Sequence, residues 1–126
     1  MDKAHKKLRV WQEAMTLVKL VYEATTCLPP TERYGLISQM RRAAVSVPSN
    51  IAEGAARKSR KESIWFYTVS RASLSELDTQ IELCYLLGFF NSSHDIHLLA
   101  QVDTVDSLLS GLIRFLRNNQ IRRETI

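Results

Sequence analysis

One group of side chains in this sequence has the residue types that nucleophilic catalysis uses. Ser46, Ser49, Asn50 and Glu53 follow one another closely in the chain. A serine nucleophile needs a neighbouring base, however, and no histidine lies near these residues in the sequence. Glu53 and Arg57 stand four residues apart, in the order that stabilises the surface of a helix. We therefore interpret the group as structural, and we predict no catalytic residues and no enzyme activity.

A second group could bind a metal ion. His94 and His97 are three residues apart and could share one face of a helix, with Asp95 between them. No other Cys or His is clustered with them, so we favour exposed histidines near a helix N-terminus over a metal site. Cys27 and Cys84 do not form a C-x-x-C pair, and no phosphate-binding or dinucleotide-binding loop is present. The sequence therefore predicts neither a metal nor a cofactor.

Four amphipathic segments must position these residues. In each of them, apolar residues recur at steps of three and four, which is the period of a helix. The first segment has two adjacent apolar stripes, Leu8, Trp11, Met15, Val18 and Tyr22 beside Val10, Ala14, Leu17 and Val21. The third begins with a capping box, Ser59 to Glu62, and its apolar face is Phe66, Ser73, Leu77, Ile81 and Cys84. The fourth has a regular apolar pattern from Leu98 to Leu116.

Strand patterns are nearly absent, and the chain has only four Gly and three Pro. We predict an all-α protein with one domain over residues 1–126. Four amphipathic helices joined by short loops pack as an antiparallel up-down-up-down four-helix bundle.

The second segment contains Pro48 within residues 31–57, which otherwise follow a helical pattern, with Thr31 as a candidate N-cap. Proline in a helix interior costs about 3 kcal/mol. Small residues surround Pro48 and allow close packing that offsets this cost. We predict one helix with a kink at Pro48; the alternative is two helices that meet near Val47. Val45, Ala52 and Ala56 form a small apolar strip that a four-helix core does not need, so we predict that this strip contacts another subunit.

Positive charge is concentrated in three parts of the chain. Residues 1–12 and 114–126 each have a net charge of +3 and residues 57–61 have +4, whereas residues 62–113 have −6. An up-down bundle brings the three basic parts to the same end. The helix macrodipole favours cations at the C-termini of helices. It opposes the cations that precede or open the first helix, Lys3, Lys6, Lys7 and Arg9, and those that open the third, Arg60 and Lys61. A polyanion is therefore the expected ligand of this end.

The predicted nucleic-acid-binding residues are Lys3, Lys6, Lys7, Arg9, Arg57, Lys58, Arg60, Lys61, Arg114, Arg117, Arg122 and Arg123. We expect non-specific binding of nucleic acid, with RNA as the favoured ligand, through phosphate contacts that salt weakens. Trp11, Trp65 and Phe66 could stack on bases, although their spacing favours the core or a subunit interface. The alternative is a structural or adaptor oligomer that binds a protein partner. No secretory signal precedes the first helix, and the longest apolar run is too short to span a bilayer, so we expect a cytoplasmic protein that binds no membrane.

The chain resembles the four-helix-bundle proteins encoded within intervening sequences of bacterial 23S rRNA genes, which are often labelled ribosomal-protein-like. The matching stretches are "LRVWQEAMTLVKLVYEAT", "LPPTERYGLISQMRRAAVSVPSNIAEGAARKSRKE" and "ASLSELDTQIELCYLLGFF", over roughly residues 8–90. The most specific part is "QMRRAAVSVPSNIAEG". Five polar residues match the motif of the family: Arg41, Arg42, Asn50, Glu53 and Arg57.

The resemblance implies an α-helical bundle, a homopentamer and a bacterial origin. It also points to the accessory variability proteins of diversity-generating retroelements, which are basic pentameric bundles that bind nucleic acid and a reverse transcriptase. No catalytic residue is carried over from the family.

Overall fold

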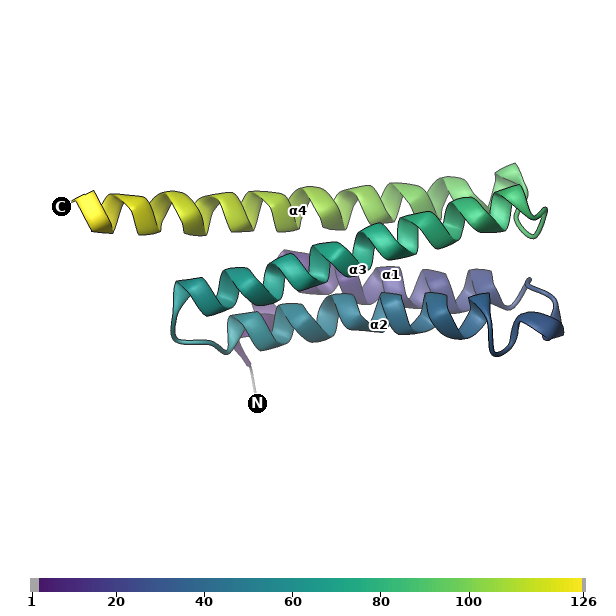
Figure 1. The fold of residues 1–126 in the computed structure, drawn as a ribbon, viewed down its shortest axis with the longest axis horizontal. Helices are drawn as coiled ribbons and strands as arrows, with labels where there is room; N and C mark the ends of the chain where they lie inside the picture. Colours follow the sequence, from purple (N-terminus) through teal and green to yellow (C-terminus); the bar gives the residue numbers. More distant parts are fainter. Residues whose placement is uncertain (1–2, 126) are drawn as a thin grey trace.

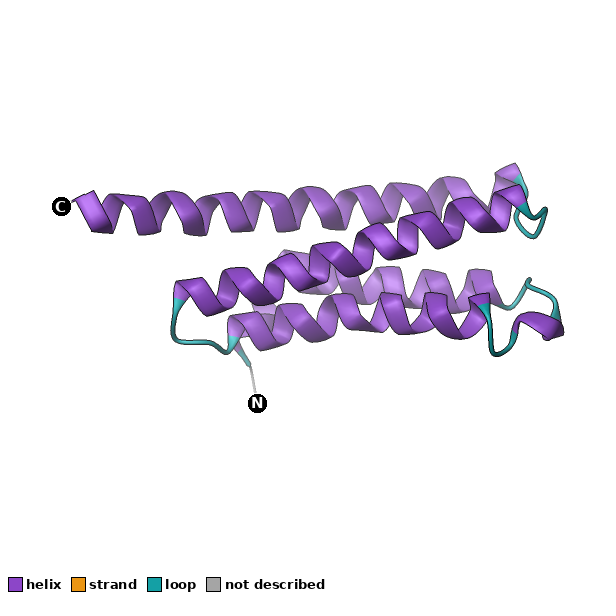
Figure 2. Ribbon diagram, viewed as in Figure 1, coloured by secondary structure: helices purple, strands orange, loops and turns teal. Residues whose placement is uncertain are grey.

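The structure of the chain, a computed structural model, describes residues 3–125, apart from the side chains of residues 92–96 and 120–125. A short 3₁₀ helix, η1 (Ala4–Lys7), precedes α1 (Arg9–Thr25), and a second, η2 (Pro30–Glu32), precedes α2 (Leu36–Ala55). The other helices are α3 (Arg60–Leu86) and α4 (Ser92–Thr125). The described residues contain helices and loops without strands, as Figure 2 shows. This confirms the predicted all-α bundle of four helices.

The four helices lie side by side as a bundle, and each contacts two neighbours. α1 contacts α2 and α4, and α3 contacts the same two helices. Figure 1 shows that the chain reverses direction at each connection, so that α1 and α3 run one way and α2 and α4 the other. Two hydrogen bonds between α2 and α3 also show that these helices run in opposite directions. The Ser63 hydroxyl donates to the Gly54 carbonyl, whereas Ser70, further along α3, donates to Val47, which lies earlier in α2.

α1 uses only one of its two apolar stripes for the core. Val10, Ala14, Leu17 and Val21 are buried, and the stripe continues to Thr25. The adjacent stripe is partly open to solvent: Met15 is 46% exposed and Tyr22 41%, while Leu8, Trp11 and Val18 are half-buried. The width of the apolar surface therefore leaves one face of α1 available on the outside of the bundle.

α3 is rotated relative to the face that the sequence predicts at its start. The Phe66 ring is only half-buried, and Tyr67 is buried in its place. The reason is that Gly54 of α2 has no side chain: a Cβ atom there would lie 2.6 Å from the Tyr67 ring. From Ser73 onward the prediction holds, because Leu77, Ile81 and Cys84 are buried.

α2 begins later than the sequence predicts. Pro30–Glu32 forms a separate 3₁₀ turn, and Gly35 has the non-helical angles φ −106° and ψ −114° before α2 starts at Leu36. Thr31 is therefore not an N-cap of this helix. The predicted capping residue of α3 is correct, because Ser59 accepts a hydrogen bond from the backbone N–H of Glu62 at 3.2 Å. α4 extends beyond its regular apolar pattern, Leu98 to Leu116, at both ends.

Pro48 is buried inside α2, which continues without interruption to Ala55. Neighbouring side chains donate hydrogen bonds to the backbone carbonyls around it. The Ser49 hydroxyl donates to the Val45 carbonyl at 2.8 Å, and the Asn50 amide donates to Ser46 at 2.8 Å. The small polar residues around the proline thus bind the local backbone. The structure therefore has one continuous helix here and not two helices that meet near Val47. A kink at Pro48 stays a prediction.

Candidate nucleic-acid interface

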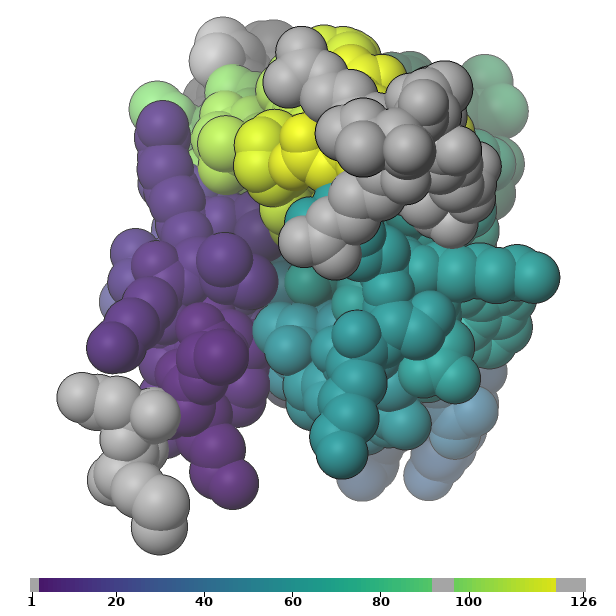
Figure 3. Space-filling model, turned by 90° about the vertical axis from the view of Figure 1, so that its left-hand side faces the viewer, coloured from purple at the N-terminus to yellow at the C-terminus, as the bar shows by residue number. Residues whose placement is uncertain are grey.

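The three basic segments lie at the same end of the bundle. In Figure 1 the N-terminal segment, the α2–α3 turn and the C-terminal part of α4 are all on the left. Figure 3 looks onto this end and shows the N-terminal residues in purple, the α2–α3 turn in teal and α4 in yellow on one face. η1 contacts both α1 and α2, and the Gln12 side chain donates to the Lys6 carbonyl at 2.9 Å, which holds the N-terminal lysines against the bundle. We call this end the basic end.

Most of the predicted binding side chains are exposed. They are Lys3, Lys6, Lys7, Arg9, Arg57, Lys58, Lys61, Arg114 and Arg117. Arg60 is half-buried, and the side chains of Arg122 and Arg123 lie outside the described residues. Within the described part of the chain, Arg57 is the only one of this set that forms an ion pair. The other positive charges of the basic end therefore lack a carboxylate partner among the described side chains.

Arg57 and Arg60, beside the α2–α3 turn, differ in their contacts. Arg57 pairs with the Glu53 carboxylate, and its guanidinium lies 5.0 Å from the centre of the Phe66 ring. The Nη1 atom of Arg60 is buried and has no hydrogen-bond partner among the described groups. A buried donor without an acceptor costs free energy.

A groove of about 610 Å³ lies between α3 and α4 at the basic end. Lys61 and Trp65 of α3 and Arg117 of α4 are among the residues that line it. Trp65 is 61% exposed and meets the Phe66 ring edge to face, with the ring centres 4.9 Å apart. The sequence predicts the core or a subunit interface for Trp65; its exposure excludes the core, and the interface stays a prediction. The rotation of α3 that buries Tyr67 turns Trp65 outward.

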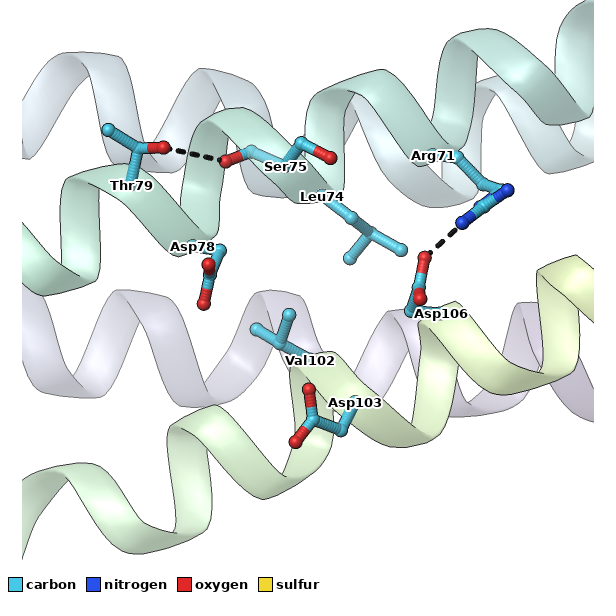
Figure 4. Close-up of a pocket in the computed structure, with 8 residues that line it drawn as sticks. All are labelled: Arg71, Leu74, Ser75, Asp78, Thr79, Val102, Asp103 and Asp106. Atoms are coloured by element: carbon cyan, nitrogen blue, oxygen red, sulfur yellow. Dashed lines mark hydrogen bonds and ion pairs between the residues drawn. The ribbon is translucent and has the colours of Figure 1, made fainter.

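A second groove between α3 and α4, of about 320 Å³, has the opposite charge. Figure 4 shows Asp78 of α3 and Asp103 and Asp106 of α4 around it. Arg71 is the one cation among its lining residues, and its Nε atom donates to Asp106 at 3.1 Å. These acids belong to the part of the chain with a net charge of −6. Their negative charge disfavours phosphate along this stretch of the bundle.

The predicted subunit contact lies on the opposite side of the bundle. Val45 is 41% exposed, Ala52 is half-buried and Ala56 is exposed. Val45 and Ala52 line a mainly apolar groove of about 370 Å³ between α1 and α2, together with Trp11 and Met15 from the open stripe of α1. The predicted strip on α2 is therefore only one side of this groove, and apolar residues of α1 form the other side.

The residues with catalytic side-chain types are engaged within the fold. The Ser46 and Ser73 hydroxyls are hydrogen-bonded at 2.8 Å across α2 and α3. Ser49 and Asn50 bind carbonyls of their own helix, and Glu53 pairs with Arg57. His97 is exposed, and the side chain of His94 lies outside the described residues.

The fold and the charges define the class of this protein: an all-α four-helix bundle with cations gathered at one end. A family model described as "23S rRNA-intervening sequence protein" matches residues 6–111. The chain therefore belongs to this family. No curated protein matches the chain. The helices within residues 3–125 include none with the length and apolar character that crossing a bilayer requires.

Proposed function

We propose that this protein is a non-enzymatic, cytoplasmic oligomer that binds RNA through its basic end. Binding rests on contacts between the exposed lysines and arginines and the phosphate backbone, so it does not depend on base sequence and weakens with salt. The name of the family, which refers to an intervening sequence of 23S rRNA, supports RNA as the nucleic acid.

The observation that carries this proposal is the gathering of unpaired cations from three distant segments. Lys6 and Lys7 precede α1, and Lys61 lies in the first turn of α3, where the macrodipole opposes a positive charge. Helix stability therefore does not account for these residues. Clustered like charges destabilise the folded chain by mutual repulsion. A bound polyanion removes that repulsion, which explains why the cluster is useful.

The oligomeric part of the proposal rests on the apolar groove between α1 and α2. We propose that Val45, Ala52 and Ala56 contact a second copy of the chain, and that the copies lie side by side with their basic ends facing the same way. The resemblance to pentameric bundles favours five subunits. Such an arrangement multiplies the number of phosphates that one assembly contacts, which raises the affinity for a long RNA.

A filter-binding titration of an RNA at several salt concentrations tests the proposal. Wild-type protein should bind with micromolar or tighter affinity at low salt and show a negative slope of log affinity against log salt. The double variant Lys58→Glu and Lys61→Glu should bind at least about tenfold more weakly, with a slope shallower by about two, because each lysine contributes about one phosphate contact. The matched control, Lys19→Glu and Arg33→Glu, changes the charge equally at exposed sites outside the basic end.

Equal affinities of the two double variants, or no binding by the wild-type protein at low salt, would contradict the proposal. Circular dichroism melts verify that the variants fold. The exposed apolar groove also supports the alternative, an adaptor that binds a protein partner. Capture of a protein partner that survives nuclease treatment, together with no affinity for RNA, would favour that alternative.

A further inference from the structure

We propose that the groove between α3 and α4 at the basic end holds one unpaired base of a single-stranded nucleic acid, stacked on Trp65. Phosphates on either side of that base contact Lys61 and Arg117. This inference rests on the proposed function and makes it more specific, because it names single-stranded segments as the favoured ligand.

The first support is the position of Trp65. Most of the indole surface faces solvent at the basic end, although burying a side chain of this size is strongly favourable. The Trp65 indole contacts the Phe66 ring on one side, and the Arg57 guanidinium lies over that Phe66 ring. The indole is therefore braced by a neighbouring ring and has a free surface. A braced, exposed aromatic ring among cations is the arrangement with which proteins stack single-stranded bases.

The second support is the charge around the groove. Lys61 lies one helical turn before Trp65 in α3, and Arg117 enters from α4, so cations flank the indole from two helices. Glu62 is the one acid among the lining residues. The Thr68 hydroxyl donates to the Ile64 carbonyl at 2.8 Å, so it is occupied within the helix. The groove thus combines an apolar platform with a net positive charge, which fits a base and its phosphates together.

The third support is the size of the groove. Its volume of about 610 Å³ is within the range of clefts that hold small ligands. A base that is paired in a duplex has both faces covered by its neighbours, so it cannot stack on a side chain. Stacking on Trp65 therefore discriminates between unpaired and paired strands, whereas phosphate contacts alone do not.

Three probes of the same strand length separate stacking from charge: a single-stranded oligoadenylate, an abasic strand with the same phosphates, and a duplex. Trp65→Ala should weaken binding of the oligoadenylate about tenfold, because stacking on an aromatic side chain contributes about 1–3 kcal/mol per base. It should leave the affinities for the abasic strand and the duplex within about twofold, since stacking does not contribute there. Trp65→Phe, which keeps an aromatic ring, should retain most of the affinity.

The matched control is Tyr34→Ala, which removes another exposed aromatic ring, outside the lining of this groove. Tryptophan emission provides an independent measurement: the oligoadenylate should quench wild-type emission, and Trp65→Phe should abolish the quenching. An equal loss of affinity for all three probes, or no loss for any, would overturn the inference. A change of oligomeric mass in Trp65→Ala without quenching in the wild type would also overturn it, because a second copy of the chain would then fill the groove. The duplex separates the two proposals. If the wild-type protein binds the duplex but Trp65 makes no difference, only this inference fails; if it binds none of the three probes, the proposed function fails as well.

Discussion

The Nε atom of Arg41 in α2 donates a 2.9 Å hydrogen bond to the hydroxyl oxygen of Thr25, the last residue of α1. Thr25 is fully buried and donates its own proton to the Val21 carbonyl at 2.8 Å. The Arg41 guanidinium also lies 4.5 Å from the centre of the Tyr22 ring and donates to the Tyr22 carbonyl at 3.3 Å. A cation near the C-terminal carbonyls of α1 complements the helix macrodipole. Arg41 of α2 thus stabilises the packing of the C-terminal end of α1 against α2.

Replacement of Arg41 by lysine should lower the free energy of unfolding by about 1–2 kcal/mol, because a lysine cannot reproduce the planar set of contacts with Thr25 and Tyr22. Chemical denaturation measures the change. Arg42→Lys is the matched control: Arg42 is exposed, and its variant should stay within about 0.5 kcal/mol of the wild type. Equal stability of both variants would show that the Arg41 contacts contribute nothing.

Replacement of Gly54 by alanine should destabilise the bundle by about 1–2 kcal/mol. The new Cβ atom would lie 2.6 Å from the Tyr67 ring, and the repacking cost of about 1–3 kcal/mol exceeds the gain in helix propensity. Gly111→Ala is the control with the opposite sign, because a Cβ there has no neighbour within 4 Å. That variant should be more stable by about 0.5–1 kcal/mol. A stabilised Gly54→Ala in thermal melts would contradict the close packing of α2 and α3.

Burial raises the pKa of the Tyr67 hydroxyl above its ordinary value of 10.0. The folded state therefore keeps its proton at a pH at which the unfolded chain has lost it. The stability contributed by this group is complete below pH 10.0 and decreases as the pH rises above that value. Tyr67→Phe should flatten the decrease in stability at alkaline pH, whereas Tyr34→Phe, at an exposed ring, should leave it unchanged. The same alkaline loss in Tyr67→Phe and wild type would contradict the prediction.

Val45→Asp tests the proposed subunit contact, because a buried carboxylate without a partner is costly at an apolar interface. Light scattering after size exclusion should give the wild-type protein a multiple of the 14.4 kDa chain mass and give Val45→Asp the mass of one chain. Leu86→Asp, at an exposed position on α3, should leave the wild-type assembly intact. A monomeric wild-type protein would remove the oligomeric part of the proposed function.

The sequence alone predicted the helices and the segregation of charge, because both depend on local order along the chain. A helical period is visible wherever apolar residues recur at steps of three and four. The cap of α3 was also predictable, since Ser59 and Glu62 are close neighbours in the chain. The helix boundaries were less predictable, because the start of α2 depends on the backbone angles of Gly35, and the apolar periodicity carries no information about these angles.

Only the tertiary structure decided which apolar residues enter the core. Both stripes of α1 are apolar, so the periodicity could not show that the Val10 stripe is buried while the Met15 stripe is open. The rotation of α3 depended on a residue of another helix: Gly54 leaves room for Tyr67, and Trp65 is turned outward as a result. The meeting of the three basic segments at one end was also predictable, because helices of alternating direction bring distant segments together. Only the tertiary structure decided that Trp65 lies exposed beside them.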